Sequence, residues 1–309
     1  MSNNEPQEIE TMRDYGWLAE DMRDFIARTD AAYPPDAAIR SIAEQRGFYD
    51  AMCALFDRPH PPGLRAEDRR IGGVPCRIYT PEGAREGVTV IYYHGGGFVV
   101  GGLESHDAIC AELAQGAGLR LIAVDYRLSP EHRHPAAFND ALAVAAAVPG
   151  PKVLAGDSAG GNLAAAVAAQ LRGIIGQVLI YPGLGGALSL PSYTRHAEAP
   201  MLTLADVEFY AGVRFDSPPA VPDPTAAPLA AVDFAGLPPS AIFIAECDPL
   251  ASDGVEYAAR LAEAGVAVAL TEEPGLVHGY LRARHMAEGA RASFARIVAA
   301  LRDLAERAA

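Results

Sequence analysis

The chain lacks several features that would mark a membrane, secreted or metal-binding protein. It has no apolar run of about 18 residues that would predict a membrane span. Its first ten residues are polar and acidic, without the basic and apolar regions of a signal peptide. Its four cysteines show no C-x-x-C pair and no metal-ligand spacing; they are Cys53, Cys76, Cys110 and Cys247. We therefore expect buried free thiols, no metal site, and a soluble protein of the cytoplasm.

Positive charge is also scarce. Lys152 is the only lysine, and the formal net charge is −14. A surface of this sign repels phosphate backbones, so we expect no nucleic-acid partner. Half of the 309 residues are hydrophobic, which is enough for a sizeable core in a chain of this length.

Apolar strands alternate with helices along most of the chain. A hairpin is predicted from about Arg70 to Pro81. The strands that follow are predicted at 88–93, 119–124, from 153, and at 177–181, 241–245 and 266–271. The helices between and after them are predicted at 105–115, 136–147, 163–171, 254–264 and 288–307. This alternation is typical of a mostly parallel sheet flanked by crossover helices, an α/β fold.

Two segments fall outside the alternation. Residues 1–61 are helical in character, with one apolar stripe from Ile9 to Ile26 and a second helix near 37–56. Residues 182–239 are rich in Pro, Gly, Ala and Ser, with one convincing helix near 204–215. So long an interruption predicts an inserted lid segment, which we expect to pack on the N-terminal helices as one cap. The expected division is 1–60 and 186–235 for the cap, and 61–185 and 236–309 for the core.

Ser158 lies in the sequence Gly156-Asp157-Ser158-Ala159-Gly160, which fits G-x-S-x-G. An apolar strand precedes it and an Ala-rich helix follows, the context in which this pattern predicts a nucleophile elbow. The turn exposes the serine hydroxyl and requires nearly side-chain-free neighbours, which Gly156 and Gly160 supply. The pattern alone is weak evidence in a chain with 30 glycines.

A second motif, His94-Gly95-Gly96-Gly97-Phe98, follows the predicted strand that ends at Tyr93. Three consecutive glycines leave backbone N–H groups unshielded, and such groups stabilise the oxyanion of acyl-transfer intermediates. We expect His94 to brace this loop by hydrogen bonding rather than to transfer protons.

A nucleophilic serine needs a base, and the base needs an orienting acid. Asp248 follows the strand at 241–245, and His278 follows the next predicted strand, so both are expected at the carboxyl edge of the sheet. Glu246, Asp253 and Asp157 are weaker candidates for the acid. The sequence therefore predicts a Ser158–His278–Asp248 triad.

Taken together, these motifs, with Tyr126-Arg127-Leu128-Ser129-Pro130-Glu131, resemble those of the hormone-sensitive-lipase-like esterases. These are the bacterial family IV carboxylesterases of the α/β-hydrolase fold. The resemblance covers the chain from about Arg70 onward. It implies the same triad, an oxyanion hole from the N–H groups of Gly95, Gly96 and Ala159, and a mainly helical cap. Ser129 and Tyr280 stand where relatives often carry Ala and Phe.

The resemblance implies a cofactor-independent serine esterase that acts on small-molecule esters of short to medium acyl chains. An amidase or deacetylase with the same triad remains open, and a non-catalytic receptor of the same fold is disfavoured because His278 is present. Six residues are candidates for an acyl pocket or for cap packing: Tyr15, Trp17, Phe25, Met201, Phe209 and Tyr210. A homodimer is possible, because the strand at 266–271 is a candidate exposed sheet edge.

Overall fold

The computed structural model describes residues 11–217 and 221–307. Its centre is one eight-stranded sheet with the strand order β1-β2-β4-β3-β5-β6-β7-β8. The strands are β1 (Leu64–Ile71), β2 (Val74–Pro81), β3 (Arg85–Tyr93), β4 (Leu119–Val124), β5 (Lys152–Asp157), β6 (Ile174–Ile180), β7 (Ser240–Cys247) and β8 (Val268–Val277). β2 pairs antiparallel with β1 and β4, and every other pair is parallel. The predicted mostly parallel sheet is confirmed.

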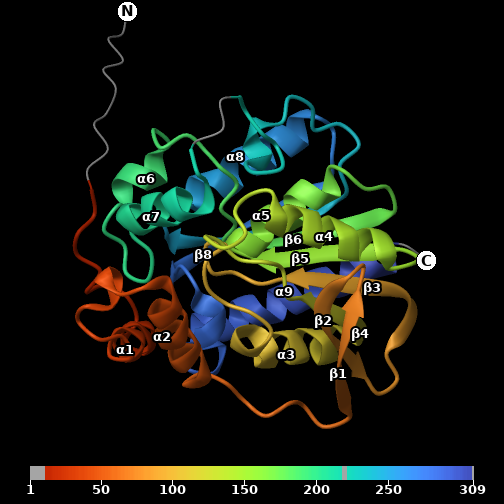
Figure 1. Cartoon of the computed structure of the whole chain (residues 1–309), viewed down its shortest axis with the longest axis horizontal. Helices are drawn as coiled ribbons and strands as arrows, with labels where there is room; N and C mark the ends of the chain where they lie inside the picture. The colour runs from red at the N-terminus through yellow and green to blue at the C-terminus, as the bar shows by residue number, and fades with distance from the viewer. Residues whose placement is uncertain (1–10, 218–220, 308–309) are drawn as a thin grey trace, which may run out of the picture.

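Helices cover both faces of the sheet (Figure 1). One face carries α3 (Asp107–Ala117) and α9 (Glu288–Glu306), and the other carries α4 (Ala136–Ala147), α5 (Ala159–Ala168) and α8 (Ala251–Glu263). Four further helices are α1 (Glu20–Asp30), α2 (Ile42–Ala54), α6 (Pro191–Arg195) and α7 (Leu204–Arg214). The 3-10 turns are η1 (Ala37–Ile39), η2 (Glu104–His106), η3 (Pro228–Ala230) and η4 (Tyr280–His285).

The sheet divides the core into two apolar clusters. Along β3, Val90 and Tyr92 face the cluster with α3 and α9, whereas Ile91 and Tyr93 face the cluster with α4, α5 and α8. This alternation follows from the two-residue period of a strand. Both sets are buried, which explains why the parallel strands read as continuous apolar runs. The four cysteines are buried free thiols, as predicted.

The N-terminal segment differs from its prediction. The apolar stripe was expected to start at Ile9, which lies outside the described residues, and the chain from Met12 to Trp17 is not helical. The helix begins only at Glu20. The second predicted helix is divided, because Ser41 caps α2 through a capping box with Glu44 and thereby ends the preceding turn.

Two other boundaries were also missed. β1 begins at Leu64 rather than near Arg70, because this edge strand is mostly charged and exposed and has no apolar pattern. The insertion between β6 and β7 contains a second, short helix, α6, which starts with a proline at its first position. No helix in the described ranges combines the length and hydropathy needed to cross a membrane.

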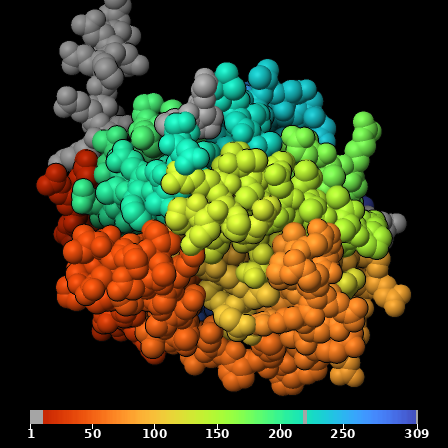
Figure 2. Space-filling model, viewed as in Figure 1, coloured from red at the N-terminus to blue at the C-terminus, as the bar shows by residue number. Residues whose placement is uncertain are grey.

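The N-terminal helices and the insertion lie side by side at one end of the sheet (Figures 1 and 2). The N–H of Met12 donates to the carbonyl of Arg195 in α6 at 2.7 Å, and the Tyr15 hydroxyl lies 3.1 Å from Nδ1 of His196. Both segments line the cavity that also contains Ser158. We call these two segments the roof, and the strand ends and loops of the sheet below them the floor.

Candidate active site

Ser158 lies in the turn between β5 and α5, with φ of 51° and ψ of −116°. Residues with a side chain rarely adopt these backbone angles, because the conformation is strained for every residue except glycine. A Cβ on Gly156 would overlap the backbone of Gly160, and a Cβ on Gly160 would overlap the carbonyl of Tyr93. The two glycines therefore allow the close backbone approach that this turn requires. The predicted strand–turn–helix context is confirmed.

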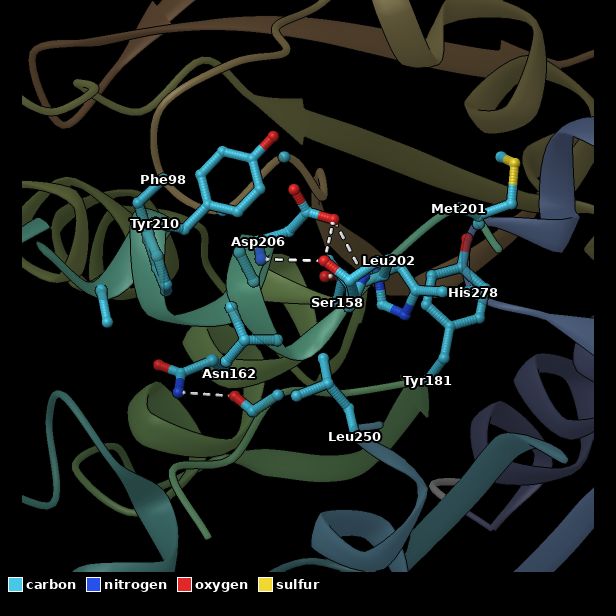
Figure 3. Close-up of a pocket in the computed structure, with 18 of the residues that line it drawn as sticks. Phe98, Ser158, Asn162, Tyr181, Met201, Leu202, Asp206, Tyr210, Leu250 and His278 are labelled. Carbon is cyan, nitrogen blue, oxygen red and sulfur yellow. Dashed lines mark hydrogen bonds between the residues drawn. The ribbon is translucent and has the colours of Figure 1, made fainter. Parts of the chain in front are cut away.

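Ser158, His278 and Asp248 form one chain of hydrogen bonds, of which Figure 3 shows Ser158 next to His278. Nε2 of His278 lies 3.0 Å from Oγ of Ser158, and Nδ1 lies 2.7 Å from Oδ2 of Asp248. Asp248 is 0% exposed, and its other oxygen accepts the N–H of Leu250 at 2.8 Å. The ring of Tyr181 packs edge-on against His278, with centroids 4.8 Å apart. This arrangement suits an imidazole that donates to Asp248 and accepts from the serine.

The other candidate acids have different partners. Oε2 of Glu246 accepts the N–H of Gly275 at 2.7 Å. Asp253 lies in the first turn of α8, where Oδ2 accepts the N–H of Leu184 at 2.7 Å. Among the described residues, neither carboxylate forms a hydrogen bond with His278.

The glycine loop follows β3, whose last residue, Tyr93, is in register with Gly156 of β5. The N–H of Gly95 donates to Oδ1 of the buried Asp157 at 2.9 Å. This bond conflicts with the prediction that Gly95 donates to an oxyanion, because a single N–H cannot serve both acceptors well. The sequence does not show which glycine N–H turns inward, because the partner is distant along the chain.

The N–H groups that remain available belong to Gly96, Gly97 and Ala159, and all three residues line the cavity. Gly96 and Gly97 have φ of 123° and 60°. Within the described part of the chain, neither N–H donates a hydrogen bond. Ala159 is the first residue of α5, where the N–H has no partner within the helix.

Asp157 supports the loop from beneath. Its Oδ1 also accepts the Tyr92 hydroxyl at 2.7 Å, and its Oδ2 lies 3.4 Å from Nε2 of His106. Burial alone would raise the pKa of Asp157, but the neighbouring His106 and the Tyr92 hydrogen bond hold it below its usual range. An ionised carboxylate is therefore fixed behind the Gly95 N–H.

His94 braces the same loop, as expected. Its Nδ1 lies 2.7 Å from the carbonyl of Gly95, and its ring stacks on Tyr126 at 4.2 Å between centroids. The Tyr126 hydroxyl donates to the His94 carbonyl at 2.7 Å. Burial lowers the pKa of His94 to about 3, so the imidazole is neutral near pH 7 and suited to bracing.

A cavity of about 1190 Å³ lies above Ser158, between floor and roof. Its apolar lining includes Met52, Met201, Leu202, Tyr210 and Leu250. Two of the six pocket candidates, Met201 and Tyr210, are therefore in the lining. No three His, Cys, Asp or Glu side chains of residues 11–217 and 221–307 converge to hold a metal ion.

The other four pocket candidates are not in the cavity lining. Trp17 and Phe209 are 52% and 40% exposed. Phe25 is fully buried and packs edge-on against Phe56 at 5.1 Å between centroids. Tyr15 contacts His196. Sequence periodicity identified these aromatics as roof residues but did not show which of them face the cavity.

The chain is similar in sequence and in fold to several known ester hydrolases. The model of a family described as alpha/beta hydrolase fold matches residues 90–282. The chain is 39% identical over 267 residues to Carboxylesterase NlhH of Mycobacterium tuberculosis, covering 78% of this chain and 83% of that protein. It is 38% identical over 292 residues to the ethyl acetate hydrolase of Pseudomonas putida, covering 87% and 92%. The crystal structure of an esterase from the bacterial hormone-sensitive lipase family matches with a TM-score of 0.83 at 26% identity, covering 95% and 99%.

Proposed function

The chain belongs to the hormone-sensitive-lipase-like carboxylic ester hydrolases of the alpha/beta hydrolase fold, and on that premise we propose that it hydrolyses short- to medium-chain acyl esters through Ser158, His278 and Asp248. The single observation that carries the proposal is the continuous hydrogen-bonded chain from the Ser158 hydroxyl to the buried Asp248 carboxylate.

In the first step, Oγ of Ser158 attacks the ester carbonyl while Nε2 of His278 takes the serine proton. Asp248 accepts the Nδ1 hydrogen, which fixes the tautomer and stabilises the imidazolium that forms. The tetrahedral intermediate then collapses, and His278 protonates the departing alcohol. The acyl group stays on Oγ of Ser158 as an ester.

In the second step, water attacks the acyl-enzyme. His278 removes a proton from the water, and the second tetrahedral intermediate releases a carboxylic acid and regenerates the serine hydroxyl. We assign the oxyanion contacts in both steps to the N–H groups of Gly96, Gly97 and Ala159, with Gly97 in place of Gly95. Each such donor typically contributes a factor of about 10²–10³ in rate.

We propose that the roof, residues 1–60 and 186–235, acts as a cap that shapes the substrate cavity. The cavity volume of about 1190 Å³ leaves room for a medium acyl chain together with an alcohol. The relative from Pseudomonas putida is named for ethyl acetate, which supports small esters as substrates.

The test is hydrolysis of p-nitrophenyl esters from acetate to palmitate, with Ser158→Ala alongside. We expect the highest kcat/KM at short to medium chains and loss of activity in the variant. Matching p-nitroanilides test the amidase alternative, which would be favoured by faster amide than ester turnover. Ester hydrolysis that survives in Ser158→Ala contradicts the proposal.

We also propose a homodimer formed through β8. This strand is last in the sheet order, its only partner among the described strands is β7, and Leu270 on it is exposed. An unpaired strand edge is a template for pairing with a second copy. A monomeric mass by light scattering at micromolar concentration contradicts this assembly.

A further inference from the structure

The only buried residue of α7 is an arginine. Arg214, at the end of the helix, is 8% exposed and lines the cavity. Its guanidinium lies over the ring of Phe98, 3.5 Å from the centroid, and Phe98 directly follows the three glycines of the loop. A charged group from the roof thus contacts the loop that carries the proposed oxyanion donors.

Arg214 uses little of its hydrogen-bonding capacity. A guanidinium has five N–H donors, and within the described residues only Nη1 has a partner, the carbonyl of Ala226 at 3.0 Å. No described carboxylate forms a salt bridge with Arg214. The charge of Asp223 acts on it from a distance, but that carboxylate is bound to His134 at 3.0 Å and to Thr225.

The other buried arginine of the cavity shows the contrast. Arg282 donates to the carbonyl of Ser105 at 2.7 Å and to the hydroxyl of Tyr49 at 2.8 Å, and it lies 3.3 Å from His106. Both terminal nitrogens of Arg282 thus have partners in the protein. Arg214, with a single partner among the described residues, retains more donors for a ligand.

The position of Arg214 relates it to the nucleophile. The carbonyl of Ala226 accepts both from Arg214 and from Nδ2 of Asn162, which lies on α5 one turn beyond Ser158. Figure 3 shows Phe98 and Asn162 on one side of Ser158, and Met201 and Tyr181 on the other. Arg214, whose guanidinium lies over the Phe98 ring, thus lines the cavity on the Phe98 side.

A buried cation without a counter-ion is unfavourable, and an anionic ligand that pairs with it recovers that loss through charge-assisted hydrogen bonds. We infer that Arg214 forms an anion subsite, which selects esters that carry a carboxylate away from the scissile carbonyl, such as monoesters of dicarboxylic acids. This inference rests on the proposed esterase function and names its substrate class.

The test uses matched anionic and neutral substrates. On the acyl side, mono-p-nitrophenyl glutarate is compared with p-nitrophenyl pentanoate. On the alcohol side, 4-acetoxybenzoate is compared with 4-methylphenyl acetate. The measured quantity is the anionic-to-neutral ratio of kcat/KM, corrected for uncatalysed hydrolysis. In the pair whose carboxylate reaches the subsite, we expect this ratio to fall about 30-fold or more in Arg214→Met. Arg214→Lys should lie between the two.

Arg260→Met is the matched control. Arg260 also lies over an aromatic ring, that of Phe234 at 4.2 Å, and also donates to backbone carbonyls, but it does not line the cavity. It should keep the wild-type ratio and activity. An equal loss on anionic and neutral esters in Arg214→Met would mean that Arg214 only clamps the roof, and it would overturn the subsite.

Two further outcomes separate the subsite from the esterase function. Hydrolysis of neutral esters, with the same anionic-to-neutral ratio in wild type and in Arg214→Met for both pairs, overturns the subsite alone. Absence of hydrolysis of every ester overturns the proposed function. If Arg214→Met does not fold, inhibition of wild-type p-nitrophenyl acetate hydrolysis by glutarate and by glutaramide is compared. We expect glutarate to inhibit at lower concentration, and equal inhibition overturns the subsite.

Discussion

The floor and the roof of the cavity are held in place by different interactions. On the floor, Ser158, Asp157 and Asp248 come from strand ends, and each is fixed by hydrogen bonds to backbone or buried side-chain groups. In the roof, the helices are held mainly by side-chain packing, to which single hydrogen bonds such as that from Arg46 of α2 to the carbonyl of Val99, at 2.8 Å, are added. The floor therefore has the fixed geometry that reaction chemistry requires, whereas the roof can change its lining residues without disturbing the fold.

The two halves of the roof differ as well. α1 and α2 add Met22, Phe25, Met52 and Cys53 to the same apolar cluster as one face of the sheet. The insertion with α6 and α7 packs in a separate cluster with three buried members, Tyr193 and Leu202 of the insertion and Leu250 of the loop after β7. We expect the insertion to be the less stable half, and it is the half that carries Arg214 and Met201.

The largest expected effect removes the acid of the floor. Asp248→Asn should lower kcat by about 10⁴-fold, because an amide donor disfavours the tautomer in which His278 accepts the serine proton. Glu246→Gln, at the end of the same strand, is the matched control and should stay near wild type. Steady-state kinetics with p-nitrophenyl acetate measure both. Equal losses in the two variants would contradict the assignment of Asp248.

The next effect tests the packing of the N-terminal half of the roof. Phe25→Ala should lower the free energy of unfolding by about 3–5 kcal/mol, because it leaves a cavity in the shared core. Phe209→Ala, on exposed α7, should change it by less than about 0.5 kcal/mol. Urea denaturation measures both. Similar changes in the free energy of unfolding for the two variants would contradict a difference in packing between the two halves of the roof.

A smaller effect concerns the support beneath the glycine loop. Asp157→Asn should lower kcat by roughly 10–100-fold with little change in KM, because the Gly95 N–H loses its charged acceptor and the oxyanion donors lose their alignment. Asp68→Asn, an exposed carboxylate paired with Arg77, is the control. A rise in KM without a fall in kcat would contradict a positioning role.

The smallest effect lies where the roof meets the floor. Burial raises the pKa of Asp253 to about 6, although hydrogen bonds from Gly186, Leu184 and Tyr193 oppose the shift. The folded protein therefore holds this proton more tightly than the unfolded chain between pH 4 and pH 6. The stability that Asp253 contributes is present below pH 4 and is lost as pH rises through 6; between pH 4.5 and pH 7 the loss is roughly 2 kcal/mol.

Asp253→Asn does not titrate, so the difference in unfolding free energy, wild type minus variant, should fall across that window. Denaturation curves at pH 4.5 and pH 7 measure it. A difference that is constant with pH would show that the carboxylate keeps its ordinary pKa in the fold.

The sequence predicted the floor better than the roof. β4 at 119–124 and α4 at 136–147 were predicted with their observed bounds, because their apolar patterns are local and strong. The Ser158 turn could be predicted because close backbone contact allows only glycine at positions 156 and 160. The position of Asp248 and His278 could be predicted because both follow strands, and the carboxyl ends of parallel strands meet at one edge of the sheet.

The remainder depends on contacts between distant residues. Which glycine N–H turns away from the cavity is decided by Asp157, and no local pattern reveals it. Whether Phe25 or Met201 faces the cavity depends on how two separate segments pack. In the sequence, Arg214 is an ordinary basic residue at a helix C-terminus, because its burial depends on how α7 packs against Phe98 of the distant glycine loop.

The most direct test of the central claim, nucleophilic attack by Ser158, is reaction with diethyl p-nitrophenyl phosphate followed by peptide mass mapping. The serine oxygen would bond to phosphorus and release p-nitrophenolate. The account predicts one diethylphosphoryl group per chain, on the tryptic peptide between Lys152 and Arg172, activity lost in proportion, and no adduct on that peptide in Ser158→Ala. Inactivation with the adduct on another peptide would contradict the account.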